Sequence, residues 1–144
     1  MQFLPCYKSH YSLGKSILTL EKPTGNLESY PTSIFDLVLH SKQNFLCLVE
    51  DNMTSFLEAS QNCQENKLKL MYGLRLSVTN SIQNQDEKSL KNRAKYIIFA
   101  KNNNGYKALI KIWSFAAREG FYYNACIDFE NLKKFWSKDL DLVV

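Results

Sequence analysis

Two continuous apolar runs stand out along the chain, and polar residues follow each of them at once. Phe45–Val49 is followed by the acidic pair Glu50 and Asp51, and Tyr96–Ala100 is followed by the turn residues Asn102–Gly105. Apolar runs of this length without alternation are typical of buried parallel strands. Because α/β proteins place their chemistry beyond the carboxyl ends of such strands, Glu50 and Asp51 are candidates for a functional site.

Apolar residues at helical spacing predict helices between and after these runs. The expected helices span residues 31–41, 54–66, 106–119 and 128–136. Asp128 is expected to be an N-cap and Gly120 a C-cap. Further strands are expected at residues 2–7, 68–78 and 140–144, and an exposed loop or a short frayed helix at residues 81–92. The alternation of strands and helices predicts an α/β fold with a mainly parallel sheet.

The composition is that of one ordinary soluble domain. The chain has 144 residues, of which 45% are hydrophobic, and its 18 Lys and Arg against 14 Asp and Glu give a net charge of +4. Both signs are interspersed, so this mildly basic charge does not by itself identify a nucleic-acid binder. No run approaches the ~20 apolar residues of a membrane span, and the N-terminus lacks the apolar core of a signal peptide. We therefore expect a cytoplasmic protein that does not enter a membrane.

The cysteines and histidines are few and scattered. The four cysteines form no C-x-x-C pair, which argues against a structural zinc site and favours reduced, partly buried thiols. Cys6 could bind a soft metal ion, but without a thiol or imidazole nearby we favour a small packed thiol. His10 and His40 are expected at the surface or at a helix end.

One long segment resembles a known family. From Tyr96 the chain reads YIIFAKNNNGYKALIKIWSFAAREGFYYNACIDFENLKKF. This is similar to the polymerase and histidinol phosphatase (PHP) domain at the N-terminus of the bacterial replicative DNA polymerase III alpha subunit. There a strand runs into an Ala-Lys-Asn-x-x-Gly-Tyr turn, and the next helix ends in Gly-Phe-Tyr-Tyr before an Ile-Asp helix start. Tyr11-Ser12-Leu13 and Tyr72-Gly73 stand where that family has Tyr-Ser and Ile-Gly.

The resemblance has implications for the fold and the extent of the domain. It implies a mainly parallel sheet or a partial, distorted β/α barrel of the PHP type. That domain is normally close to twice the length of this chain. We therefore expect residues 1–144 to be a PHP-like domain, specifically its N-terminal half, ending on an apolar strand whose edge would be left uncovered.

The resemblance also implies where a metal centre would lie. Active members of the family hold divalent ions with a His-x-His pair, an Asp-His pair and a Glu, a set that can generate a metal-bound hydroxide for phosphoester hydrolysis. These positions align here with Cys6 and Lys8, with Glu50 and Asp51, and with Arg75. Ammonium and guanidinium groups cannot coordinate a cation and repel one nearby. We therefore expect a degenerate site with no metal, no cofactor and no catalytic residue.

Two interpretations of the acidic pair remain open. Glu50 and Asp51 could be a residual carboxylate pair, or they could be solvated or helix-capping residues. Lys8 and Arg75 could instead form ion pairs with them, so that side-chain cations replace the charge of the lost metal. We favour these ion pairs, because without a cation the two carboxylates would repel each other.

Aromatic and basic residues near the C-terminus could contact nucleic acid. Tyr122 and Tyr123, with Arg118 just before them, could stack on bases while the cation binds a phosphate. We favour packing of this aromatic cluster in the core with one Tyr at the surface. Lys107 and Lys111 could follow a DNA backbone. They are equally typical of the solvated face of a helix.

Three functional hypotheses follow. The leading one is a divergent, metal-less PHP-like segment of a bacterial or phage DNA polymerase III alpha subunit. It would act as a scaffold in DNA replication, with the remainder of the polymerase chain, other replisome proteins or DNA as partners. The segment alone would be inactive, because the nucleotidyl-transfer carboxylates of that family lie far downstream. One alternative is a metal-dependent phosphoesterase or 3'-5' exonuclease with a rearranged ligand set. The other is a free-standing nucleic-acid or protein binding module.

Overall fold

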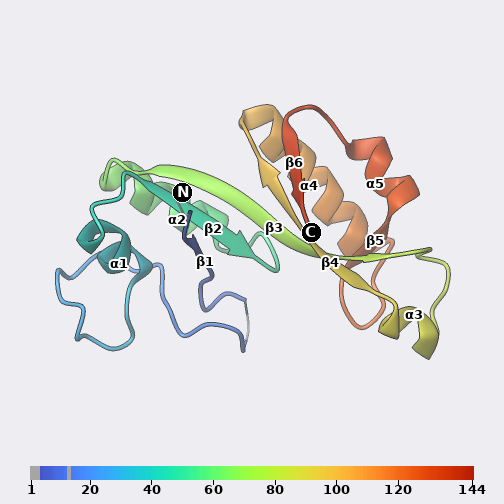
Figure 1. Cartoon of the computed structure of the whole chain (residues 1–144), viewed down its shortest axis with the longest axis horizontal. Helices are drawn as coiled ribbons and strands as arrows, with labels where there is room; N and C mark the ends of the chain where they lie inside the picture. The colour runs from blue at the N-terminus through green and yellow to red at the C-terminus, as the bar shows by residue number, and fades with distance from the viewer. Residues whose placement is uncertain (1–3, 13) are drawn as a thin grey trace. The chain divides into compact units, whose positions relative to one another are not determined.

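A computed structural model describes residues 4–12 and 14–144. Gln2 and Phe3, which begin the first expected strand, and Leu13 of the Tyr-Ser-Leu segment lie outside the described residues. The chain divides into two compact units, Met1–Gly73 and Leu74–Val144. Strand β3 (Lys69–Thr79) runs through the boundary, so each unit contains part of it (Figure 1).

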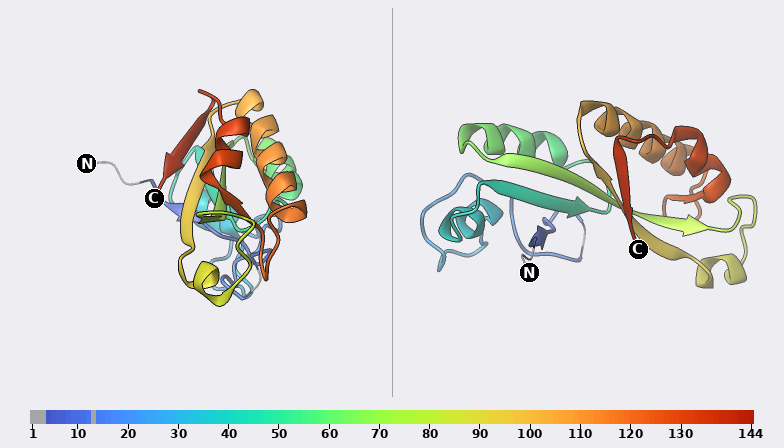
Figure 2. Two further views of the ribbon diagram at one scale, coloured as in Figure 1. Left: turned by 90° about the vertical axis from the view of Figure 1, so that its right-hand side faces the viewer. Right: turned by 45° about the horizontal axis from the view of Figure 1, so that its top comes forward.

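The first unit places a buried strand between two helices. It contains β1 (Cys6–Tyr7), α1 (Ile34–His40), β2 (Phe45–Glu50), α2 (Phe56–Glu65) and the start of β3. α1 and α2 lie on opposite sides of β2 (Figures 1 and 2). Every residue of β2 after Phe45 is buried, as the continuous apolar run predicts for a strand covered on both faces. β1 pairs with β2 in parallel, with Cys6 opposite Cys47.

Local sequence explains where α1 begins and which face of α2 is buried. Ser33 caps α1, since its hydroxyl oxygen accepts a hydrogen bond from the backbone N–H of Phe35 at 3.1 Å. α2 buries Phe56, Ala59 and Cys63, which lie three and four residues apart and so share one face. Both helices were predicted from this spacing, and the structure confirms them with tighter bounds.

The second unit combines the end of β3 with a helical layer. Its other elements are α3 (Glu87–Lys91), β4 (Ala94–Ala100), α4 (Asn103–Arg118), β5 (Cys126–Asp128), α5 (Phe129–Phe135) and β6 (Leu140–Val143). β5 is parallel to β3. α4 and α5 lie on the same side of β4 and β6 (Figure 2). Asp128 caps α5 as predicted, accepting a hydrogen bond from the backbone N–H of Asn131 at 2.9 Å.

The last strand is an antiparallel exception to the mainly parallel arrangement that was predicted. β6 is antiparallel to β4, with Leu140 opposite Ala100 and Val143 opposite Ile97. An apolar run predicts a buried strand but carries no information on its direction, which is set here by pairing with β4. In the first unit β1 and β2 are parallel, and in the second unit β5 is parallel to β3 while β6 is antiparallel to β4, so the strand pairing is mixed.

Two glycines are required by close approach of other backbone segments. A Cβ at Gly105, in the first turn of α4, would overlap the carbonyl oxygen of Asp139. A Cβ at Gly120 would overlap the carbonyl oxygen of Cys126. Gly120 was expected to end α4 as a C-cap, but Glu119 is the C-cap residue and has an ordinary helical conformation. Gly120 is therefore needed for packing space and not for a left-handed turn.

One further property concerns membranes. None of the helices in the described part of the chain has the length and apolar character needed to cross a bilayer. The longest, α4, has 16 residues, and it carries Lys107, Lys111 and Arg118.

Candidate functional site

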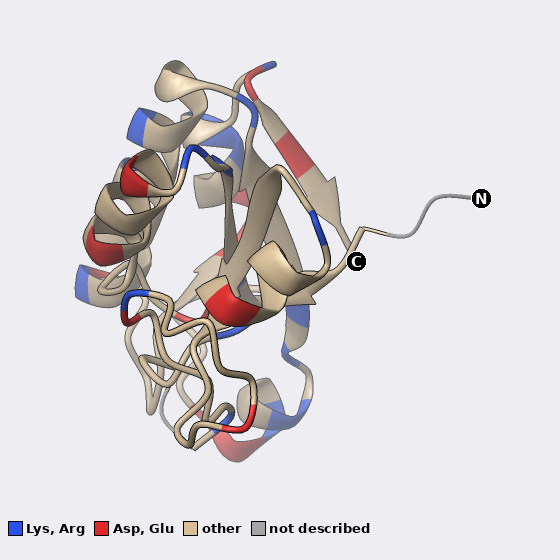
Figure 3. Cartoon of the chain, turned by 90° about the vertical axis from the view of Figure 1, so that its left-hand side faces the viewer, with Lys and Arg blue, Asp and Glu red and all other residues tan. Residues whose placement is uncertain are grey.

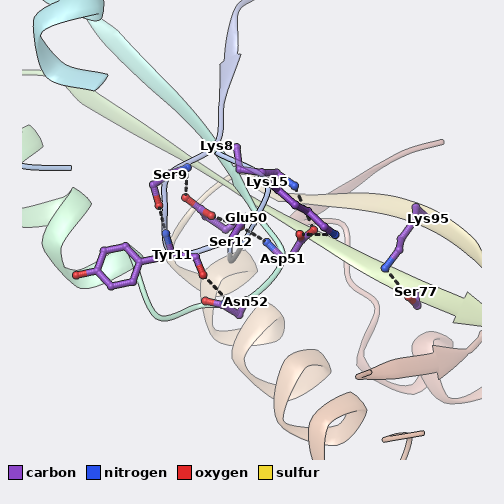
Figure 4. Close-up of polar contacts among 10 residues, drawn as sticks. All are labelled: Lys8, Ser9, Tyr11, Ser12, Lys15, Glu50, Asp51, Asn52, Ser77 and Lys95. Atoms are coloured by element: carbon purple, nitrogen blue, oxygen red, sulfur yellow. Dashed lines mark hydrogen bonds and ion pairs between the residues drawn. The ribbon is translucent and has the colours of Figure 1, made fainter. Parts of the chain in front are cut away.

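Polar side chains gather in the first unit where β1 and β2 end. Because the two strands are parallel, their carboxyl ends meet at the same edge. The loop after β1 therefore lies beside Glu50 and Asp51 (Figure 4). We call this group the carboxyl-end cluster. It consists of Lys8, Ser9, Ser12, Lys15, Glu50 and Asp51.

Glu50 is a fully buried carboxylate held by neutral donors. Its Oε1 accepts a hydrogen bond from the backbone N–H of Ser9 at 2.8 Å, and its Oε2 accepts one from the hydroxyl of Ser12. Ser12 Oγ also accepts a hydrogen bond from the backbone N–H of Asp51 at 3.0 Å. A buried charge is costly unless hydrogen bonds satisfy it. These bonds therefore fix the loop after β1 to the end of β2.

Asp51 lies between two ammonium groups. Lys8 Nζ is 3.2 Å from Oδ1 and Lys15 Nζ is 3.0 Å from Oδ2. The Lys8 and Asp51 side chains are only 19% and 20% exposed, so water screens this pair less than a surface pair. The Lys8–Asp51 ion pair predicted from the sequence is present. Lys15 was missed, although it belongs to the same loop as Ser12.

Two further hydrogen bonds join the loop after β1 to the segment after β2. Asn52 Nδ2 donates to the carbonyl oxygen of Tyr11 at 3.1 Å. The Tyr11 hydroxyl donates to Glu58 Oε2 at 2.6 Å, and this hydrogen bond, with the charge of Glu58, raises the Tyr11 pKa above its usual value. His10 is exposed beside this contact, as expected. Its ring lies 4.4 Å from that of Tyr11, centroid to centroid.

The other aligned ligand positions are placed differently. Cys6 is exposed on β1, and its Sγ lies 3.4 Å from Cys47 Sγ. The expectation that Cys6 has no thiol neighbour was wrong, because pairing of β1 with β2 brings together residues 41 positions apart. Arg75 lies on β3 in the second unit and is partly buried. Its pairing with the acidic residues stays a prediction.

The carboxyl-end cluster does not fit a divalent metal ion. Each oxygen of Asp51 faces an ammonium group, and each oxygen of Glu50 accepts a hydrogen bond. An ammonium group has no lone pair and repels a cation. In the part of the chain that the structure describes, no group of three or more His, Cys, Asp and Glu side chains is placed to hold a metal. Cys6, Glu50 and Asp51, the residues that a rearranged ligand set would draw on, thus do not form a metal site.

The aromatic residues after α4 are more exposed than predicted. Tyr123 is 78% exposed, as expected for one Tyr at the surface, but Phe121 is 58% exposed, so the expected packing of Phe121 in the core was wrong. Tyr123 has a φ of 62°, in the left-handed region. Tyr122 is half-buried, and the Arg93 guanidinium lies 5.7 Å from the centroid of its ring. Arg118 is exposed and forms an ion pair with its neighbour Glu119 at 2.8 Å.

The lysines of α4 and α5 share a cavity in the second unit. Lys107 and Lys111 line a space of about 360 Å³ together with Lys134 and Asp139. Charges of both signs are interspersed along the ribbon (Figure 3). The grouping of lysines from two helices was not predicted from the sequence, because it depends on how α4 and α5 pack.

Comparison with known families assigns the chain to a class. Residues 28–143 match the PHP domain, which defines a superfamily of the phosphoesterase type. The chain belongs to the PHP domain family. The match begins after Lys15, so the lysines of the carboxyl-end cluster lie outside it. No curated protein matches the chain.

Proposed function

We propose that this chain is a PHP domain segment in which lysine side chains have replaced the metal ions, so that its role is structural and not catalytic. The observation that carries the proposal is the position of Asp51 between Lys8 Nζ and Lys15 Nζ, at 3.2 and 3.0 Å. Side-chain ammonium groups here occupy the space beside a carboxylate where a phosphoesterase of this family would need a Lewis acid.

Charge balance supports this replacement. Glu50 and Asp51 carry two negative charges at the end of β2, and Lys8 and Lys15 bring two positive charges. Two ammonium groups supply the charge of one divalent ion, but they cannot polarise a phosphoryl oxygen or lower the pKa of a bound water as a metal does. On this proposal the cluster keeps a balance of charge without the chemistry of a metal centre.

The replicative polymerase context rests on the resemblance of the segment from Tyr96 to Phe135. We propose that the segment belongs to a bacterial or phage DNA polymerase III alpha subunit in the cytoplasm. There it would scaffold the remainder of the polymerase chain or other replisome proteins, with no cofactor of its own. The sequence of the reading frame downstream of Val144 tests this part. Continuation into a polymerase supports it, and a stop codon without an adjacent polymerase gene contradicts it.

Metal analysis and activity assays test the loss of catalysis. The purified chain is assayed with Mg²⁺, Mn²⁺ and Zn²⁺ on a generic phosphodiester and on a mismatched primer end. We expect no stoichiometric metal and no turnover. Stoichiometric metal, with turnover that Asp51→Ala abolishes and the surface change Glu65→Ala retains, would overturn the proposal.

A second candidate function, contact with nucleic acid, is favoured by the exposed Tyr123 ring and by the lysines around the α4 and α5 cavity. Aromatic rings and cations together bind single strands without sequence preference. We expect Lys107→Glu with Lys111→Glu to weaken binding of a labelled single-stranded oligonucleotide, measured by fluorescence anisotropy. The matched control is Lys88→Glu with Lys91→Glu on α3, which removes the same charge elsewhere. Equal loss in both variants would indicate non-specific attraction only.

A further inference from the structure

The two thiols at the start of the β1–β2 pair form an unusual contact. Cys6 and Cys47 are direct partners in the parallel register. Their sulfurs lie 3.4 Å apart, close enough for one thiol to donate a hydrogen bond to the other. Cys6 is exposed and Cys47 is fully buried. The Cys6 sulfur is therefore accessible to a reagent in solution, and the buried Cys47 sulfur lies next to it.

The geometry suits a covalent bond between these sulfurs. Neighbouring strands lie about 4.8 Å apart, within the ~4.4–6.8 Å Cα separation of disulfides. Residues that face each other in a register project to the same side of the sheet. The sulfurs need only close from 3.4 Å to the ~2.05 Å of an S–S bond. The other two thiols are placed elsewhere, Cys63 on the buried face of α2 and Cys126 donating to the Gly120 carbonyl at 2.8 Å.

We propose that Cys6 and Cys47 are a reversible disulfide site that is oxidised by a small-molecule disulfide such as oxidised glutathione. The Cys6 thiolate attacks one sulfur of the oxidant, whose S–S bond breaks and releases one glutathione thiolate. The Cys47 thiolate then attacks the Cys6 sulfur of the mixed disulfide and releases the second glutathione thiolate. Two electrons pass to the oxidant, and the two thiol protons end on the two glutathione molecules.

The order of these steps follows from burial. Burial raises the pKa of the Cys47 thiol to about 12, and its contact with Cys6 adds to the effect. Cys47 is therefore almost entirely protonated near neutral pH, while Cys6 faces solvent. Because the thiolate is the nucleophile, the first attack belongs to Cys6. The second step gains from proximity, since the attacking sulfur is already in contact.

The bond would act on the carboxyl-end cluster. Cys6 precedes Lys8 by two residues, and β1 itself has only two residues. A covalent link between β1 and β2 would hold the loop that carries Lys8, Ser9 and Ser12 against Glu50 and Asp51. The reduced form relies on hydrogen bonds and ion pairs alone. This inference does not depend on whether the lysines replaced a metal ion.

Oxidation of the full chain in glutathione buffers tests the proposal. The background variant Cys63→Ser with Cys126→Ser leaves only the proposed pair. We expect it to lose both titratable thiols and two hydrogens of mass, and to recover them with excess reduced glutathione. Cys6→Ser and Cys47→Ser in this background should each keep one thiol or carry one glutathione. Because Cys63 and Cys126 are buried, non-reducing peptide mapping of the unsubstituted chain provides an independent readout and should find a Cys6–Cys47 link.

Several outcomes would overturn it. A glutathione adduct that persists on Cys6 while Cys47 stays a thiol would show that the buried sulfur cannot complete the exchange. A dimer linked through Cys6, or a link to Cys63 or Cys126, would assign the reactivity to another arrangement. A chain that keeps all four thiols under oxidising buffer yet takes up one Cu(I) would make the pair a soft-metal site. Slower hydrogen exchange of the β1 amides after oxidation would support the proposal. Unchanged exchange would contradict the proposed restraint of the loop after β1.

Discussion

Glu50 and Asp128 are both buried carboxylates on the last residue of a strand, but they stabilise different parts of the fold. Glu50 ends β2 in the first unit and Asp128 ends β5 in the second. Asp128 accepts hydrogen bonds from the backbone N–H of Asn131, three residues later, and of Ile82. Glu50 accepts from Ser9 and Ser12, which lie 41 and 38 positions earlier. Asp128 thus combines a helix cap with one long-range contact, because Ile82 lies 46 positions earlier, whereas both contacts of Glu50 are long-range.

The difference concerns what a buried charge needs. At Asp128 the first turn of α5 supplies the Asn131 donor as soon as the helix forms, and helix N-termini favour negative charge. The Ile82 donor is supplied by the segment after β3. At Glu50 the donors exist only when the loop after β1 has docked. The same chemical group thus stabilises a local element and a long-range contact in the second unit, and long-range contacts alone in the first.

The largest expected effect comes from removing the long-range carboxylate. Glu50→Ala leaves the Ser9 N–H and the Ser12 hydroxyl buried without their acceptor, and it opens a cavity. We expect a loss of about 3 kcal/mol in the free energy of unfolding, measured by urea denaturation. Glu65→Ala, which removes an exposed partner of Lys22, should change it by less than about 0.5 kcal/mol. Similar values for the two variants would mean that the loop does not depend on Glu50.

Substitution of the cap residue Asp128 should lower the free energy of unfolding less than Glu50→Ala does, and the loss should depend on pH. Burial acts to raise the pKa of the Asp128 carboxyl, but hydrogen bonds from Asn131 and Ile82 outweigh it and lower this pKa below 3.8. The stability that this carboxylate contributes is therefore complete above pH 3.8 and is lost as the pH falls through its folded-state pKa. Asp128→Asn should cost about 1.5 kcal/mol at pH 7, because the amide keeps one acceptor only.

The free energy of unfolding, measured as the pH is lowered, tests the predicted direction of this dependence. The difference between the parent and Asp128→Asn should shrink as the pH falls below 3.8. A difference that is constant from pH 7 to pH 2 would show that the hydrogen bonds, and not the charge, carry the effect.

Lys8 tests the charge arrangement around the long-range contact. Lys8→Met keeps the aliphatic length and removes the ammonium group from Asp51 Oδ1. We expect a loss of about 1 kcal/mol, because the pair is mostly shielded from water. Thermal unfolding at low and high salt measures it. A gain in stability would mean that burying the two charges costs more than their attraction returns.

Lys15 should give the smallest effect. Its side chain is 45% exposed, so Lys15→Met is expected to cost about 0.5 kcal/mol or less and to lose even this at high salt. Because both lysines contact one carboxylate, the double variant should not be the sum of the single ones. Strict additivity would contradict the view that Lys8 and Lys15 act together on Asp51.

Local patterns were enough to predict most elements. The apolar runs identified β2 and β4, helical spacing identified α1, α2, α4 and α5, and the position of Asp128 before α5 identified its cap. Each of these depends on neighbours within a few residues. The Lys8–Asp51 pair was also predicted, but only because a family resemblance aligned two distant segments.

What was missed depends on contacts between distant segments. The pairing of Cys6 with Cys47 and the role of Lys15 follow from the docking of β1 on β2, which local periodicity does not specify. The antiparallel direction of β6 follows from its register with β4. The exposure of Phe121 depends on how the segment after α4 packs, which the aromatic residues alone do not specify.

The two glycines at the ends of α4 have a consequence for the order of folding. The Asp139 backbone closes over Gly105, and the Cys126 backbone closes over Gly120. Both segments follow α4 in the chain, and Asp139 also accepts a hydrogen bond from the Lys101 N–H at 2.9 Å. The packing of both ends of the helix therefore involves β5 and the residue before β6. α4 should therefore open and close together with these strands as one cooperative unit, with a shared free energy of opening in native-state hydrogen exchange.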